Sequence, residues 1–151
     1  MSIPPADDGR ATSGGHVACR RCRCRLSDRV DRAAPSLLDR EATGGVPTIG
    51  AGLVCRDPEP VVVWVSGPRD RTESPREEVP AGSLVVHPAS TRCLCSSGRD
   101  TGCCGSDGCD GPNRSCDHCH AVVGMMRTDC WTRYEIRFLA SAVDLVGLTH
   151  G

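Results

Sequence analysis

The stretch TRCLCSSGRDTGCCGSDGCDGPNRSCDHCH, residues 91–120, contains seven of the twelve cysteines of this 151-residue chain. A second group lies in HVACRRCRCR, residues 16–25, while Cys55 and Cys130 stand apart. A chain with this many thiols either oxidises them to disulfides or uses them as metal ligands, and its redox compartment decides which. The cysteine spacing therefore carries most of the information on how the chain is held together.

The compartment is inferred from the N-terminal segment, MSIPPADDGRATSGG, residues 1–15. It lacks a basic region followed by an apolar one, so we expect no secretory signal and a cytoplasmic protein with a disordered N-terminal tail. The longest apolar run, VVVWV at 61–65, is far shorter than the ~20 residues that span a bilayer, so no membrane association is expected. Cytoplasmic thiols stay reduced, which favours metal coordination over disulfides.

The composition predicts a thin hydrophobic core. Leu, Ile, Val and Phe together account for 28 residues, and Gly and Pro for another 28. Bound metal is the expected source of additional stability, because metal-binding free energy becomes folding free energy. The net charge of −1 argues against a general electrostatic attraction to nucleic acid.

These features predict an α+β fold: small, loop-rich and zinc-stabilised, with short antiparallel strands and one or two short helices. Residues 16–56 are expected to form an N-terminal Cys-rich zinc finger, with the short helices in SDRVDRAAPSLLDRE, residues 27–41. Residues 58–148 are expected to form a β-rich module with a second Cys-rich zinc site. Its C-terminal apolar residues have i, i+4, i+7 spacing, which predicts a further helix: Leu139, Val143 and Val146.

Apolar runs bounded by turn residues predict the strands of the second module. YEIRF, residues 134–138, alternates apolar and charged residues and predicts a half-buried strand. The charged segment 67–82 is expected to be a surface loop. The other predicted strands are VVVWVS at 61–66, LVVH at 84–87 and AVVGMM at 121–126.

The first cysteine group contains Cys19-x2-Cys22, the spacing of a zinc knuckle. Two thiolates on one tight turn can bind a single ion while backbone N–H groups stabilise their charge. Cys55 is the expected third ligand, and Cys24 or His16 the fourth.

A second knuckle, Cys116-x2-Cys119, ends the densest cysteine run. Its partners are expected among Cys93, Cys95, Cys103, Cys104 and Cys130, with His118 and His120 as alternatives. We predict two zinc ions per chain. The alternative is that the two knuckles bind one ion together, as in a zinc ribbon with a long insert. The predicted metal ligands are Cys19, Cys22, Cys24, Cys55, Cys95, Cys104, Cys116 and Cys119.

Four arginines, Arg20, Arg21, Arg23 and Arg25, lie among the first ligands. Their positive charge lowers the cost of thiolate formation, since a tetrathiolate zinc site carries a formal charge of −2. The alternative is a patch that contacts nucleic acid or a protein partner. If nucleic acid is bound at all, we expect this first finger to bind it.

The motif search predicts a non-enzymatic protein. The signatures HExxH, Walker A, GxSxG and GxGxxG are absent. CDHC, residues 116–119, has the form of a redox motif but lacks the βαβ pattern that such motifs accompany. We therefore predict a zinc-binding structural or interaction module, a nucleic-acid- or protein-binding regulator without hydrolase or oxidoreductase activity. The alternative is a metalloenzyme or thiol-dependent enzyme that uses an open zinc position or a spare cysteine.

Two stretches resemble known Cys-rich sequences. CRRCRCRLSDRVDRA, closed by IGAGLVC at 49–55, resembles a small finger of bacterial and phage proteins with a CxxCGRxLxDxxS start and a GxGPxC end; Arg23 stands where that pattern has glycine. GCCGSDGCDGPNRSC, followed by DCWT, resembles an uncharacterised actinobacterial Cys-rich, zinc-finger-like family. Both resemblances imply metal binding and no established activity.

Overall fold

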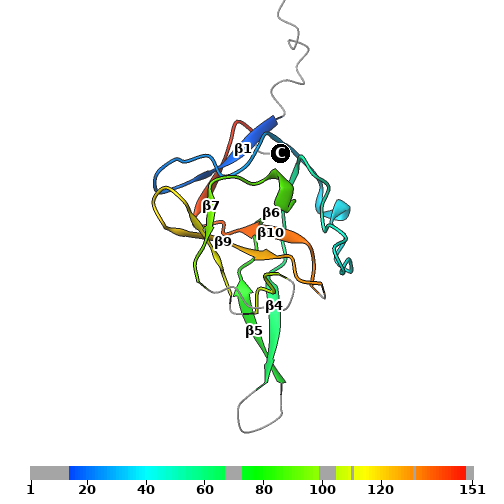
Figure 1. The fold of residues 1–151 in the computed structure, drawn as a ribbon. Helices are drawn as coiled ribbons and strands as arrows, with labels where there is room; N and C mark the ends of the chain where they lie inside the picture. The colour runs from blue at the N-terminus through cyan, green and yellow to red at the C-terminus, as the bar shows by residue number, and fades with distance from the viewer. Residues whose placement is uncertain (1–13, 67–72, 99–104, 110, 131, 149–151) are drawn as a thin grey trace, which may run out of the picture.

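The computed structural model shows a chain built almost entirely of β-strands (Figure 1). The residues it describes are 14–66, 73–98, 105–109, 111–130 and 132–148. Within these residues the helical segments are two single 3-10 turns, Pro35–Leu37 and Pro88–Ser90, each of which starts at a proline. The predicted α+β class is therefore wrong, and the fold is mostly β.

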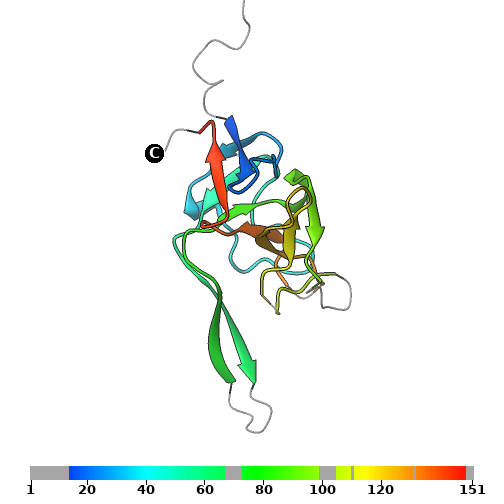
Figure 2. The same ribbon diagram turned by 90° about the vertical axis from the view of Figure 1, so that its left-hand side faces the viewer.

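Nine strands form one sheet in the order β11-β1-β2-β3-β6-β10-β9-β8-β7, and β4 and β5 form a separate hairpin. The hairpin projects from the body of the protein (Figures 1 and 2). All neighbouring pairs are antiparallel except β2 and β3. The strands are β1 Gly14–Cys19, β2 Val30–Arg32, β3 Leu53–Arg56, β4 Val61–Ser66, β5 Glu73–Val79, β6 Leu84–Val86, β7 Leu94–Ser96, β8 Arg114–Cys116, β9 Val122–Arg127, β10 Glu135–Phe138 and β11 Val143–Val146.

The sheet curls, so that strands far apart in its order enclose one hydrophobic core (Figure 2). Val17 and Cys19 of β1, near one end of the order, belong to the same buried cluster as Cys116 of β8, near the other end. Ile136 and Phe138 of the central strand β10 complete the middle of this cluster. The curl therefore brings the end of β1 and the end of β8 together.

The other face of the central strands is buried as well. Cys55 and Val85 pack on this face with Ala33, Leu38 and Ile49 of the β2–β3 connection. The strand predicted at 134–138 exists as β10, but the prediction that one of its faces is exposed is wrong. All four residues of β10 are buried. Its two charged residues are buried because they pair within a salt-bridge network instead of facing water.

The predicted strands at 61–66, 84–87, 121–126 and 134–138 are confirmed as β4, β6, β9 and β10 to within one or two residues at each end. The segment expected to be a loop, 67–82, contains strand β5, which pairs with β4 along its length.

Both predicted helices are wrong. SDRVDRAAPSLLDRE contains strand β2 and one 3-10 turn. At the C-terminus, the helix expected from Leu139, Val143 and Val146 is replaced by a turn at 140–142 and strand β11. β1 offers β11 a hydrogen-bonding edge, and the β-branched side chains of Val143 and Val146 favour a strand. Strands from both predicted modules, 16–56 and 58–148, lie in the same nine-stranded sheet.

No helix in the part of the chain that the structure describes is long and apolar enough to cross a lipid bilayer.

Candidate metal centre

The first knuckle is a tight turn at the end of β1. The N–H of Cys19 donates to the carbonyl of Cys24 (2.8 Å), and the N–H of Arg23 donates back to the carbonyl of Cys19 (2.8 Å). Arg23 has a φ of 68°, in the left-handed region where an L-residue costs about 1–2 kcal/mol. Arg23 thus has the backbone conformation that suits the glycine of the resembling finger pattern.

The second knuckle, at the end of β8, repeats this backbone geometry. The N–H of Cys116 donates to the carbonyl of Ala121 (2.8 Å), and the N–H of His120 donates to the carbonyl of Cys116 (2.8 Å). His120 has a φ of 64°, in the same left-handed region as Arg23. Both CxxC sequences therefore adopt the same local turn, and in each the second cysteine is carried by the turn itself.

The two knuckles face each other and bring four thiols together. The Sγ atoms of Cys19, Cys22, Cys116 and Cys119 all lie within 4.8 Å of one another. The Sγ–Sγ distance is 3.6 Å for Cys19–Cys119 and also for Cys22–Cys116. Thiolates on a tetrahedral zinc ion with Zn–S bonds of about 2.3 Å are about 3.8 Å apart, so this arrangement fits such an ion. It does not fit disulfides, whose sulfurs are about 2.05 Å apart.

The four thiols differ in their access to solvent. Cys19 and Cys116, at the strand ends, are fully buried in the main core, whereas Cys22 and Cys119, in the turns, are partly exposed. Burial, together with hydrogen bonds to the other three thiols, raises the pKa of Cys22 to about 12, against a backbone hydrogen bond at Cys24 that lowers it. Without a metal ion the Cys22 thiol is therefore protonated at neutral pH.

The other predicted ligands lie outside this cluster. Cys24 follows the first knuckle, and burial, then interaction with Cys93, raises its pKa to about 11. Cys55 is buried on the opposite face of the sheet, where its Sγ contacts the carbonyl of Arg56. Cys95 lies on β7 and contacts the carbonyl of Ser115. Cys104 lies outside the described residues.

The histidines offered as alternative ligands, His118 and His120, are exposed. Within the described residues, the four-cysteine cluster is the one group of three or more His, Cys, Asp or Glu residues whose ligand atoms converge. The two knuckles are thus brought together, the alternative that the sequence left open. A second zinc site stays a prediction, since Cys103 and Cys104 are among the residues not described.

Three of the four arginines of the first knuckle, Arg20, Arg23 and Arg25, take part in interactions within the chain. Arg20 pairs with Asp144 and donates to three backbone carbonyls of residues 140–143. Arg23 pairs with the same carboxylate (2.8 Å), and Arg25 donates to the carbonyl of Ser27. Arg20 and Arg23 therefore attach the first knuckle to the turn before β11 and to β11 itself.

Comparison with known proteins found no counterpart of this chain. A scan against known protein families, a search of curated proteins and a search of solved structures each returned no match. Kinship with the Cys-rich families that the spacing resembles stays a prediction.

Proposed function

We propose that this protein is a zinc-binding structural module in which one Zn²⁺ closes the curled sheet. The observation that carries the proposal is the convergence of Cys19, Cys22, Cys116 and Cys119 from two identical turns. These turns follow β1 and β8, which lie near opposite ends of the strand order. A metal ion bound there replaces the hydrogen bonds that would close a complete barrel.

The donor set supports zinc. Four thiolates in a tetrahedron are typical of zinc and of iron–sulfur centres. Zinc needs no redox partner and is held by four-cysteine sites in which paired CxxC turns supply the ligands. Metal analysis separates zinc from iron directly.

The same donor set supports a structural role over a catalytic one. A catalytic zinc keeps one coordination position for water or substrate, with three protein ligands. Here all four sulfurs lie within 4.8 Å of one another, so the protein can supply all four ligands of a tetrahedral shell. Contact with nucleic acid or a protein partner through Arg20, Arg21, Arg23 and Arg25 stays a prediction.

Zinc counting tests which cysteines bind. Replacing Cys119 by serine is expected to lower the zinc content by one ion per chain, because it removes one of the four converging thiols. Cys55→Ser is the matched control, since it removes a buried thiol that is outside the cluster. Native mass spectrometry of the parent and both variants counts the bound ions. Loss of zinc from Cys55→Ser, or its retention in Cys119→Ser, would contradict the assignment.

Zinc binding is also expected to release protons. The metal binds thiolates, whereas burial raises the pKa of Cys22 above the ordinary value of about 8.5, so at pH 7 the metal must displace the proton of this thiol. Affinity should accordingly increase with pH and fall steeply in acid. Calorimetric titrations in two buffers of different ionisation enthalpy measure the release. Zinc binding without proton release would mean that Cys22 is already a thiolate in the metal-free chain.

A further inference from the structure

A cavity of about 220 Å³ lies away from the cysteine cluster, beside the start of the β4–β5 hairpin. Its wall includes Pro60, Val61 and Val62, of which Val62 is an exposed apolar side chain. The remainder of the lining is charged: Arg40, Glu59, Arg127, Arg133 and Arg137.

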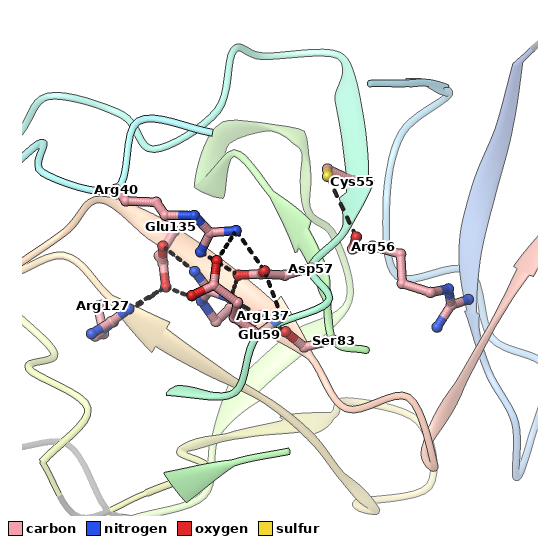
Figure 3. A network of polar contacts seen from close by, with 9 residues as sticks. All are labelled: Arg40, Cys55, Arg56, Asp57, Glu59, Ser83, Arg127, Glu135 and Arg137. Carbon is pink, nitrogen blue, oxygen red and sulfur yellow. Dashed lines mark hydrogen bonds and ion pairs between the residues drawn. The ribbon is translucent and has the colours of Figure 1, made fainter. Parts of the chain in front are cut away.

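A buried ion-pair network lies beside the cavity (Figure 3). At its centre, Arg137 donates to Asp57 (2.6 Å) and to Glu135, and all three side chains are almost fully buried. Arg40 binds Asp57 with both Nη atoms, and Arg127 binds Glu135 through Nε and Nη2. The guanidinium groups hold the pKa of both carboxyls well below its usual range, against the opposing effect of burial.

Among the described residues in and beneath this cavity, the charges do not balance. The set contains three carboxylates, those of Asp57, Glu135 and Glu59, the last of which pairs with Arg40. It contains four guanidinium groups, those of Arg40, Arg127, Arg133 and Arg137. Every member of the set has an ion-pair partner except Arg133, which makes no side-chain hydrogen bond or ion pair with any residue that the structure describes. Among the described residues, Arg133 is therefore the one member of this set whose positive charge has no ion-pair partner.

The position of Arg133 makes this charge unfavourable. The side chain is half-buried on the cavity wall, and burial lowers its pKa. Glu135 opposes that effect, while Arg127, Arg137 and Arg40 add to it. A partly desolvated guanidinium surrounded by like charges gains strongly from an anion, and its planar donors fit a carboxylate or phosphate.

We infer that this cavity binds a small organic anion, whose carboxylate or phosphate group pairs with Arg133 while a short apolar part packs against residues 60–62. Arg127 lines the same cavity and binds Glu135 through Nε and Nη2. Its Nη1 atom takes no part in that pair, so Arg127 is a second donor beside the anion. Arg137 and the two buried carboxylates position these donors. None of the four clustered cysteines lines this cavity.

The test uses the full zinc-loaded chain and four probes at constant ionic strength: acetate, butyrate, inorganic phosphate and phenyl phosphate. Binding is followed by calorimetry or by amide shifts of residues around the cavity. Butyrate should bind more tightly than acetate, and phenyl phosphate more tightly than phosphate, because of the apolar wall. The preferred pair identifies whether the natural ligand presents a carboxylate or a phosphate.

Arg133→Gln is expected to weaken binding of the best probe roughly tenfold or more, the effect of losing one charge-assisted hydrogen bond. Arg32→Gln is the matched control, since Arg32 is exposed on β2 and does not line the cavity; it should bind as the parent does. Arg133→Lys retains the charge without the planar guanidinium group, so its affinity for the best probe should lie between those of the parent and Arg133→Gln. Arg133→Lys also serves as the test if Arg133→Gln does not fold. Absence of binding of all four probes up to about 10 mM, or equal weakening by Arg133→Gln and Arg32→Gln, would overturn the inference.

Discussion

Removal of zinc with a chelator is expected to unfold the protein as a whole. A structural zinc site contributes an apparent ~10–16 kcal/mol at pH 7, which is comparable with the entire ~5–15 kcal/mol stability of a typical domain. In this chain the two knuckles join β1 and β8, and Cys19 and Cys116 are part of the main core. Far-UV circular dichroism and amide exchange before and after chelation measure the loss.

The Cys55→Ser variant separates this effect from the general loss of a buried thiol. Cys55 packs on the opposite face of the sheet, so the variant should bind zinc and unfold on chelation as the parent does. Re-addition of zinc should restore the signal in both. Persistence of slow amide exchange in β1 and β8 after the metal has been removed would show that the sheet closes without it.

Replacing Arg137 by methionine is expected to destabilise the zinc-loaded protein by about 3–5 kcal/mol, the usual effect of breaking a buried ion pair. Arg137 is 2% exposed and bridges Asp57 and Glu135, both 0% exposed. Its removal leaves each carboxylate with one ion-pair partner at the edge of the network, Arg40 for Asp57 and Arg127 for Glu135. Urea unfolding at saturating zinc measures the change.

Arg56→Met is the matched control for this experiment. Arg56 is exposed on β3 and donates one hydrogen bond to the carbonyl of Gly82. Its replacement should change the free energy of unfolding by no more than about 1 kcal/mol. A similar loss in both variants would mean that the buried network contributes nothing specific to stability.

The pH dependence of the network has a definite sign. Arginine pairing lowers the pKa of Asp57 and Glu135 in the folded state, so the stability they contribute is fully present above their ordinary pKa of about 4. It is lost as the pH falls through the lowered folded values. The difference in stability between parent and Arg137→Met should therefore shrink in acid, because protonation removes the unmatched negative charges from the variant.

Local sequence was sufficient to locate the two knuckles and four of the strands. Each CxxC turn needs only a few adjacent residues and two backbone hydrogen bonds, so its spacing can be recognised without the rest of the fold. The strands at 61–66, 84–87, 121–126 and 134–138 are short apolar or alternating runs bounded by turn residues. These features depend on interactions close in the chain.

The C-terminal segment shows where local patterns fail. The spacing of Leu139, Val143 and Val146 is compatible with a helix, but four residues of the segment pair with β1, more than 120 positions earlier. A strand forms its hydrogen bonds with a partner strand, and here that partner lies too far away in the sequence for a local pattern to reveal it. The same limit explains why the sequence could not choose between two metal sites and one shared by both knuckles.

The amino-acid sequence thus specifies a cysteine-rich chain of short strands with two CxxC turns. Only the curled sheet decides that Cys19 and Cys22 face Cys116 and Cys119, because the closure brings together strands near opposite ends of its order. Tertiary structure likewise assembles the arginine-lined cavity from segments around residues 40, 57, 127 and 135. In the sequence these charged residues resemble ordinary surface positions, and it is burial on both faces of the sheet that makes them pair. Among the described residues of this network, Arg133 is the one without an ion-pair partner.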